Sequence, residues 1–184
     1  MKYAAVSVAA DGYFKYKTGR VGAATLQYEQ KLLEDIPDEI MQSFCGVGNP
    51  FTISSIKSGS TVLDIGCGAG VDLYVASKLV GQTGSVYGTD ITIEMVHQAR
   101  QNLAKLGVDN ARILYVTNEQ LPFADNTFDI IISNGVINLS PDKPKLFREI
   151  FRVLRKNGRL QFADIILGKE LPPHLAASAE SWSQ

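Results

Sequence analysis

The 184-residue sequence contains few of the residues that mark several protein classes. Its two cysteines, Cys45 and Cys67, stand far apart without a second pair, so neither a disulfide framework nor a metal site is predicted. The formal net charge of −1 does not favour nucleic-acid binding, which usually needs a basic face. No apolar run approaches the roughly 20 residues that span a membrane, and the apolar stretch after Lys2 is too short for a signal peptide. We therefore expect a cytoplasmic globular protein with no nucleic-acid or membrane partner.

Histidine, the most frequent general base in enzymes, is also scarce. The two histidines are His97 and His174. We expect His97 to face solvent on a helix, while His174 follows two prolines in the last part of the chain. Neither is a clear candidate for proton transfer, so no catalytic residue is predicted.

From Thr61 onward, short β-rich runs alternate with amphipathic runs, a pattern typical of βαβ units and a parallel sheet. Most of the β-rich runs are short and apolar, as strands covered on both faces should be. The strands are expected at Thr61–Ile65, Ser85–Asp90, Ala111–Val116, Phe128–Ser133 and Arg159–Ile166. We predict an α/β fold, with a helical cap segment over residues 1–58 and a Rossmann-like domain over 59–184. Helices should flank its parallel sheet, and the Rossmann-like fold type implies the strand order 3-2-1-4-5.

Capping residues predict where the helices between these strands begin and end. One helix is expected from Gly70 to Leu79, and the next should begin after Thr92 and end at Gly107. The last should open at Ser140-Pro141-Asp142 and end before Gly158. In the cap segment, a short helix is expected from Pro37 to Phe44.

The segment VLDIGCGAG, residues 62–70, follows the first expected strand and opens a helix. Gly66 and Gly68 let the backbone turn sharply and approach a ligand closely. Free N–H groups at the helix start favour a negative group nearby. The spacing of Gly66, Gly68 and Gly70 is G-x-G-x-G, which differs from the dinucleotide pattern G-x-G-x-x-G/A.

Two acidic residues flank this loop. Asp64 lies two residues before the first glycine, where it can face the amino group of a methionine. Asp90 closes the second strand about 20 residues after the loop, where a carboxylate can bind ribose hydroxyls. Together these features favour S-adenosylmethionine (SAM) over NAD as the cofactor. A structural turn without a ligand and an NAD-type Rossmann domain are the alternatives.

Further cofactor contacts are expected at the carboxyl ends of the strands, where ligands bind in open α/β sheets. Ile91 and Met95 are placed to pack on the adenine, although Met95 also fits the apolar face of a helix. Asn118 and Glu119 lie in a loop that can reach the adenine or remain solvated. The full set of predicted cofactor contacts is Asp64, Gly66, Cys67, Gly68, Gly70, Asp90, Ile91, Met95, Asn118, Glu119, Asn134 and Gly135.

The chain resembles class I SAM-dependent methyltransferases of the arsenite methyltransferase-like group. The stretches that carry the resemblance are FCGVGNP (44–50), VLDIGCGAG (62–70) and SNGVINLSPDK (133–143). It extends over most of residues 13 to 172 and implies methyl transfer from SAM to a small-molecule acceptor. It also implies a seven-stranded sheet, of which we find no sixth or seventh strand.

Arsenite methyltransferases hold trivalent arsenic through cysteine thiolates, and here the sequence departs from them. Val47 and Gly135 stand where two of these cysteines would fall, and Cys45 lies two residues off. Because soft thiolate ligands select a metalloid, the resemblance implies a methyltransferase whose acceptor is not identified. The alternatives are a SAM-binding protein without catalysis and, less favoured, an NAD-type oxidoreductase.

Two expectations concern contacts outside the glycine loop. Tyr16 is the cap-segment residue most suited to lie over the cofactor pocket, with plain aromatic packing as the alternative. If the fifth strand is the last, one sheet edge lacks a partner, and such edges tend to be covered or to recruit another chain. We therefore expect Arg159–Ile166 to be covered by the tail or to pair across a homodimer.

Overall fold

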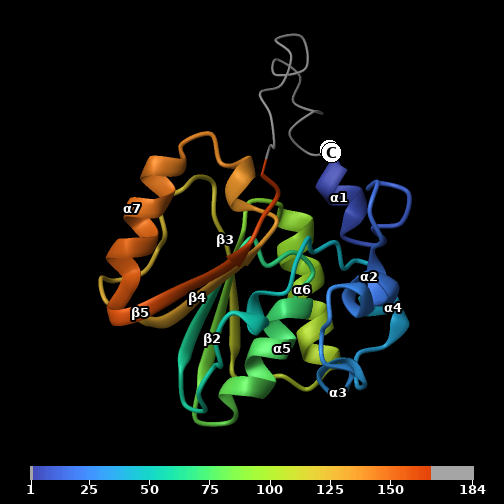
Figure 1. Ribbon diagram of the computed structural model, residues 1–184, viewed down its shortest axis with the longest axis horizontal. Coiled ribbons are helices and arrows are strands. Elements are labelled where there is room, and N and C mark those ends of the chain that lie inside the picture. The colour runs from blue at the N-terminus through green and yellow to red at the C-terminus, as the bar shows by residue number, and fades with distance from the viewer. Residues whose placement is uncertain (1, 167–184) are drawn as a thin grey trace.

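The computed structural model describes residues 2–166 and contains one parallel sheet (Figure 1). The strand order is β3-β2-β1-β4-β5, as predicted. Because the order reverses beside β1, the chain leaves β1 and β4 toward opposite sides, which opens a crevice at their carboxyl ends. The strands are β1 (Thr61–Ile65), β2 (Ser85–Asp90), β3 (Ala111–Tyr115), β4 (Phe128–Asn134) and β5 (Leu154–Ala163).

Helices cover the two faces of this sheet and bury side chains that alternate along the strands. Val62 and Ile132 point to one face, where they pack with residues of α5, α6 and the cap segment. Leu63 and Ile131 point to the other face, where they pack with α7. Both faces are therefore apolar, which explains the short continuous apolar runs in the sequence. The crossover helices are α5 (Val71–Val80), α6 (Ile93–Lys105) and α7 (Lys143–Val153).

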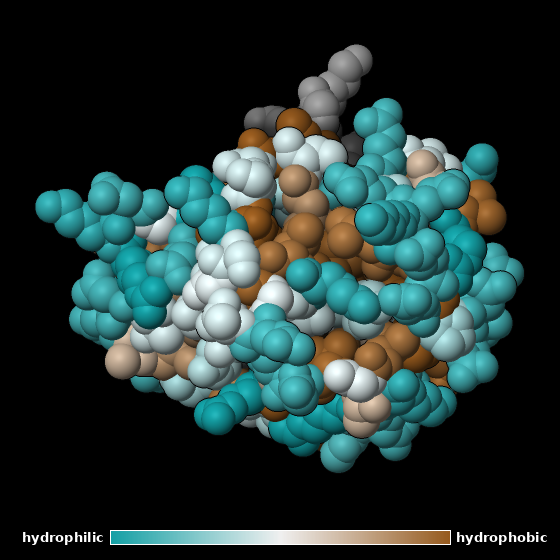
Figure 2. All heavy atoms as spheres, turned by 90° about the horizontal axis from the view of Figure 1, so that it is seen from below, coloured by the Kyte–Doolittle hydropathy of each residue, from teal (hydrophilic) through white to brown (hydrophobic). Residues whose placement is uncertain are grey.

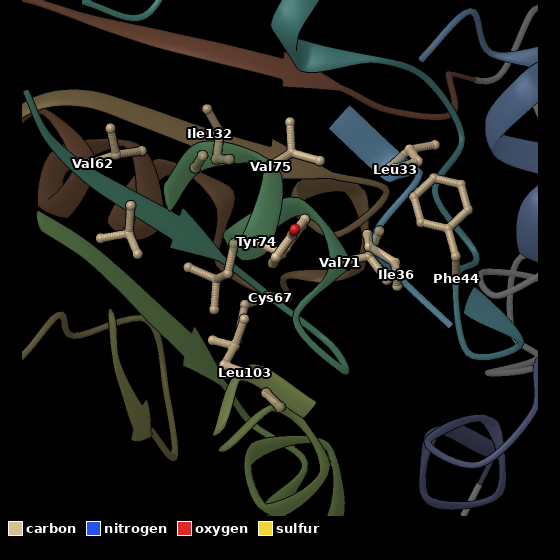
Figure 3. Packing of buried hydrophobic residues seen from close by; sticks show 14 of the residues in the cluster. Leu33, Ile36, Phe44, Val62, Cys67, Val71, Tyr74, Val75, Leu103 and Ile132 are labelled. Atoms are coloured by element: carbon tan, nitrogen blue, oxygen red, sulfur yellow. The ribbon is translucent and has the colours of Figure 1, made fainter. Parts of the chain in front are cut away.

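The cap segment is helical, and it shares a hydrophobic core with the sheet domain. Leu33, Ile36 and Phe44 of the cap segment belong to the same buried cluster as Val71 and Tyr74 of α5 (Figure 3). The boundary predicted after residue 58 thus separates two segments that bury apolar surface against each other. The helices of the cap segment are α1 (Lys2–Val6), α2 (Gly19–Thr25), α3 (Gln30–Leu33), α4 (Asp38–Met41) and the 3₁₀ turn η1 (Pro50–Thr52).

The start predicted for the last crossover helix is wrong. The N-cap of α7 is Asp142, whose carboxylate accepts a hydrogen bond from the Lys145 amide at 3.0 Å. Ser140 instead follows the 3₁₀ turn η2 (Ile137–Leu139) and donates its hydroxyl to Glu119. The carboxylate of Asp142 therefore satisfies a free helix amide, while the Ser140 side chain forms its hydrogen bond with Glu119 in the loop after β3.

The fifth strand also differs from its predicted range. It begins at Leu154, which pairs with Phe128, but the register with β4 then shifts, and Ile130 pairs with Arg159. The chain turns between these pairs, where Asn157 has a φ of 67°. The strand ends at Ala163 rather than at Ile166.

Within residues 2–166, β5 pairs with β4 alone, so its outer edge has no partner there. Large apolar side chains are exposed on β5, on α7 and just after the strand: Phe147, Phe151, Phe162, Ile165 and Ile166. Another face, seen from below the view of Figure 1, has hydrophobic residues in its centre and hydrophilic ones around them (Figure 2). The expected cover by the tail, like His174, falls on residues 167–184 and lies outside the described part, and the dimer stays a prediction.

No helix among residues 2–166 is long and apolar enough to cross a membrane. His97 lies on the exposed side of α6, as predicted.

Candidate cofactor-binding site

The glycine loop between β1 and α5 is tied to the end of β2. The amides of Gly66 and Cys67 both donate to the Thr89 carbonyl, at 2.8 and 3.0 Å, and the Gly68 amide donates to Asp90 Oδ2 at 2.9 Å. Gly66 has a φ of 73°, and a Cβ there would lie 2.8 Å from Cβ of Val136 and closer still to both its methyl carbons. Only glycine fits this position, because both the conformation and the space exclude a side chain.

A hollow of about 60 Å³ lies beside this loop. It is lined by residues 43–46 of the cap segment and by residues of β1, the loop and the start of α5. The predicted residues Asp64, Gly66, Cys67, Gly68 and Asn134 line it. Asp90, Ile91, Met95, Asn118, Glu119, Gly70 and Gly135 are not among its lining residues.

Asp64 is one of two buried acids that line this hollow, the other being Asp72. Only 2% of the surface of Asp64 is exposed to solvent. Among residues 2–166, its Oδ2 atom has no hydrogen-bond partner. Burial raises its pKa well above the ordinary value, and the nearby carboxylates of Asp72 and Asp90 raise it further. A buried carboxylate oxygen without a donor is costly unless a cation or donor reaches it. The arrangement therefore provides an acceptor for a positively charged ligand group.

Asp90 lies where β2 ends. Its Oδ2 atom accepts from the Gly68 amide and its Oδ1 atom from the Thr92 amide at 2.8 Å. Burial raises its pKa, and these hydrogen bonds oppose the rise. Each carboxylate oxygen can accept a second hydrogen bond, so ribose hydroxyls remain possible partners. Ile91 beside it is 69% exposed, which leaves its side chain open to a flat ring.

Met95 occupies a different environment. It is 3% exposed and packs in a small cluster with Val6, Ala10 and Ala69. Met95 thus lies where α6 packs against the glycine loop and the first residues of the cap segment. This is the core position that the sequence offered as the alternative to a ligand contact.

Asn118 and Glu119 lie in the loop after β3. Asn118 Oδ1 accepts from the Gln120 amide at 2.7 Å, and Glu119 accepts from Ser140 at 3.0 Å. The end of this loop is held by the Leu121 amide, which donates to Glu149 at 2.9 Å. The loop is therefore anchored, and both predicted side chains lie in its partly exposed portion.

Asn134 joins the cap segment to the sheet. Its Oδ1 atom accepts from the amides of Val47 and Gly48, at 2.8 and 3.2 Å. Its Nδ2 atom lies within hydrogen-bond distance of Tyr28 Oη, the Gly48 carbonyl and Asp72 Oδ2, at 2.9 to 3.0 Å. The side chain thus holds residues 46–48, which we call the strap, beside the glycine loop, and its polar atoms are engaged there.

Asp72 and Tyr28 are buried residues of this network that sequence reasoning missed. The Tyr28 hydroxyl donates to Asp72 Oδ1 at 2.8 Å. Burial raises the pKa of Asp72 to about 6, although hydrogen bonds from Asn134 and Tyr28 lower it. The one available signal was an acid two residues after Gly70, in the first turn of α5. That signal also describes an ordinary helix start, so it did not stand out.

Gly135 lies against Val47 of the strap. Gly135 has a φ of 74°, and a Cβ there would lie 3.3 Å from both methyl carbons of Val47. The two positions at which the resemblance expects thiolates are therefore adjacent in space, and here they carry a hydrogen and an isopropyl group.

A parallel sheet in this order, with a glycine loop after β1 and a carboxylate at the end of β2, is a Rossmann-like arrangement of the kind found in class I SAM-dependent methyltransferases and in dinucleotide-binding domains. The methyltransferase domain family matches residues 56–184, and the chain belongs to this family. Its cofactor is accordingly SAM.

Three relatives illustrate the range of the similarity. An arsenite methyltransferase of Halobacterium salinarum is 38% identical over 74% of this chain and 35% of its own length. A ubiquinone/menaquinone biosynthesis C-methyltransferase of Klebsiella pneumoniae is 45% identical over 60% of this chain and 45% of its own. The crystal structure of an arsenic(III) SAM methyltransferase from Chlamydomonas reinhardtii superposes with a TM-score of 0.72 at 37% identity, covering 83% of this chain and 56% of that one. The chain spans less than half the length of the curated relatives it matches.

Proposed function

We propose that this chain transfers a methyl group from SAM to a small-molecule acceptor. The observation that carries the proposal is the buried Asp64 oxygen, which lines the hollow beside the glycine loop and has no donor within the described residues. The amino-acid end of SAM carries an ammonium group that would satisfy it. The hollow of about 60 Å³ suits this end of the cofactor, and the exposed Ile91 next to Asp90 suits the adenosine.

The role of the residues is to bind and orient. SAM supplies an activated methyl group on a sulfonium when it is bound. Asp64 would hold the amino group, Asp90 the ribose hydroxyls, and the strap would close one side of the site. The acceptor atom forms its bond to the methyl carbon with its own lone pair, while the carbon–sulfur bond breaks and leaves its electron pair on sulfur. Because proximity and orientation supply most of the rate, the site needs a base only if the acceptor must first lose a proton.

We propose further that the acceptor is not held by thiolates. Val47 and Gly135 support this, because neither side chain can ligate a metalloid, although the two positions are in contact. The proposed acceptor is therefore a molecule bound by ordinary packing and polar contacts, rather than arsenite.

Calorimetric titration tests the cofactor site directly. SAM and its demethylated product S-adenosylhomocysteine should bind the wild type, and NADH should not. Asp90→Ala should weaken both sulfur compounds by about tenfold to a hundredfold, because it removes a charged hydrogen-bond acceptor worth about 1.5 to 3 kcal/mol. Binding of neither compound by the wild type would overturn the proposal.

We also propose a cytoplasmic location and a homodimer formed through the outer edge of β5. The low cysteine count supports the location. The outer edge of β5, which has no partner strand within residues 2–166, and the exposed Phe162 support the dimer. Light scattering should give twice the mass of one chain, and Phe162→Glu should halve it. Tyr115→Glu, on the exposed β3 strand at the opposite edge of the sheet, is the matched control and should leave the mass unchanged. A wild-type monomer would contradict the dimer.

A further inference from the structure

A second hollow adjoins the strap. It has a volume of about 440 Å³, within the range of about 300 to 1,000 Å³ typical of small-molecule pockets. Gly46 lines both this hollow and the cofactor hollow. A Cβ on Gly46 would lie 2.7 Å from Cζ of Phe44 and closer still to Nδ2 of Asn134, so the chain has no room for a side chain here. The two hollows therefore meet at Gly46, which borders both of them.

The wall of the second hollow is largely apolar. Leu26 from the end of α2, Val47 from the strap and Ile165 from beyond β5 contribute aliphatic side chains. Tyr16 also lines it, and its hydroxyl already donates to the Cys45 carbonyl at 2.9 Å. These residues come from three separate segments of the chain. The hollow thus offers an apolar body of ligand size a surface to pack against.

Lys17 is the single charged residue in this wall. Its side chain is exposed, and no salt bridge or hydrogen bond to it is found among residues 2–166. Acidic side chains are missing from the lining. An ammonium that has no partner in the described part of the chain, and that lies beside an apolar surface, is complementary to a ligand that combines an apolar body with a negative group.

We propose that the second hollow binds the methyl acceptor, and that this acceptor is an apolar molecule carrying an anionic group such as a carboxylate. The anionic group pairs with Lys17, and the apolar body packs on Leu26, Val47 and Ile165. The assignment as the acceptor site rests on the proposed methyltransferase function, through the shared wall at Gly46. The ligand chemistry rests on the hollow itself.

The test measures binding of 1-naphthoate to the full chain by calorimetry, beside the cation 1-naphthylmethylammonium as a ligand of matched size. Naphthoate should bind and the cation should bind at least about tenfold more weakly, a difference expected from one close charge pair. Lys17→Glu should weaken naphthoate binding by about tenfold or more, and the exposed Lys15→Glu should not. Ile165→Asp should weaken it similarly, while Ile166→Asp, on the neighbouring residue outside the wall, should not.

Binding of S-adenosylhomocysteine to each variant shows that the chain is folded and separates the two proposals. The inference stands if all variants bind S-adenosylhomocysteine equally, and if naphthoate affinity falls in Lys17→Glu and Ile165→Asp but not in Lys15→Glu and Ile166→Asp. The inference is wrong, while the cofactor site remains, if naphthoate fails to bind or binds no more tightly than the cation. It is equally wrong if Lys15→Glu and Lys17→Glu weaken naphthoate binding to the same extent. If naphthoate binds as expected but S-adenosylhomocysteine does not, the proposed function fails, and with it the assignment of the hollow to an acceptor.

Discussion

Gly66→Ala is expected to destabilise the fold by about 2 to 4 kcal/mol and to abolish measurable SAM binding. The left-handed conformation at Gly66, with its φ of 73°, costs an alanine about 1 kcal/mol. The collision of the new Cβ with Val136 adds about 1 to 3 kcal/mol, because a packed interior does not yield easily. Urea unfolding followed by circular dichroism measures the first effect, and calorimetry the second.

Gly107→Ala is the matched control for this change. Gly107 has a similar φ of 67°, but a Cβ there would meet nothing within 4 Å. It should cost only the conformational part, about 1 kcal/mol, and leave SAM binding intact. The double variant Gly66→Ala, Val136→Ala should recover part of the lost stability, since it removes the obstructing methyl groups. Equal costs for Gly66→Ala and Gly107→Ala would show that close packing against Val136 plays no part.

Asp64→Asn should weaken SAM binding and stabilise the ligand-free protein at the same time. Binding should fall by about tenfold to a hundredfold, because the ammonium loses a charged partner worth about 1.5 to 3 kcal/mol. The melting temperature of the ligand-free chain at pH 8 should rise by several degrees, at about 2 to 4 °C per kcal/mol for a chain of this size. The gain arises because the buried carboxylate no longer has to ionise without a partner.

The pH dependence has a definite sign. Burial raises the native pKa of Asp64 above its unfolded value, so the native state binds more protons between the two. Stability therefore falls as pH rises from the unfolded pKa of about 4 toward the native pKa. Asp72 acts in the same direction up to its native pKa of about 6, and it remains in the variant. The difference between wild type and Asp64→Asn across a pH series thus reports the titration of Asp64 together with its interaction with Asp72 and Asp90.

Asp109→Asn, at an exposed acid, is the control for the loss of one negative charge. It should change neither the melting temperature at pH 8 nor SAM affinity. The interpretation of Asp64 would be wrong if Asp64→Asn bound SAM as tightly as the wild type. It would equally be wrong if the variant melted below the wild type at pH 8.

Local patterns were enough to predict the sheet and the glycine loop. The bounds of β1 and β2 agree residue for residue with prediction, because each strand is a short run that ends where the chain must turn. The position of Asp90 followed from the same pattern. Asp90 is the last residue of the strand next to β1, so it lies beside the glycine loop that follows β1. The N-cap at Thr92 and the left-handed Gly107 bound α6 as expected.

Where two local signals competed, the sequence could not decide between them. Ser140 and Asp142 are both good N-cap residues, and the choice depends on Glu119, which accepts the Ser140 hydroxyl from a loop after another strand. Met95 likewise fits an apolar helix face and a ligand contact equally well. Its burial against Val6 depends on where the first residues of the cap segment pack.

By itself, the sequence determined the fold class and the identity of the cofactor loop, since both depend on periodicity and on residues close together in the chain. The strand order followed from the Rossmann-like fold type that these patterns indicate. Only the tertiary structure decided that Asn134 would bind Tyr28 and Asp72 in one buried network, and that Val47 would touch Gly135. The second hollow is of the same kind, because its wall combines residues 16–26, 46–47 and 165. Contacts between distant segments cannot be predicted from local sequence patterns, because they form only when packing of the apolar faces brings those segments together.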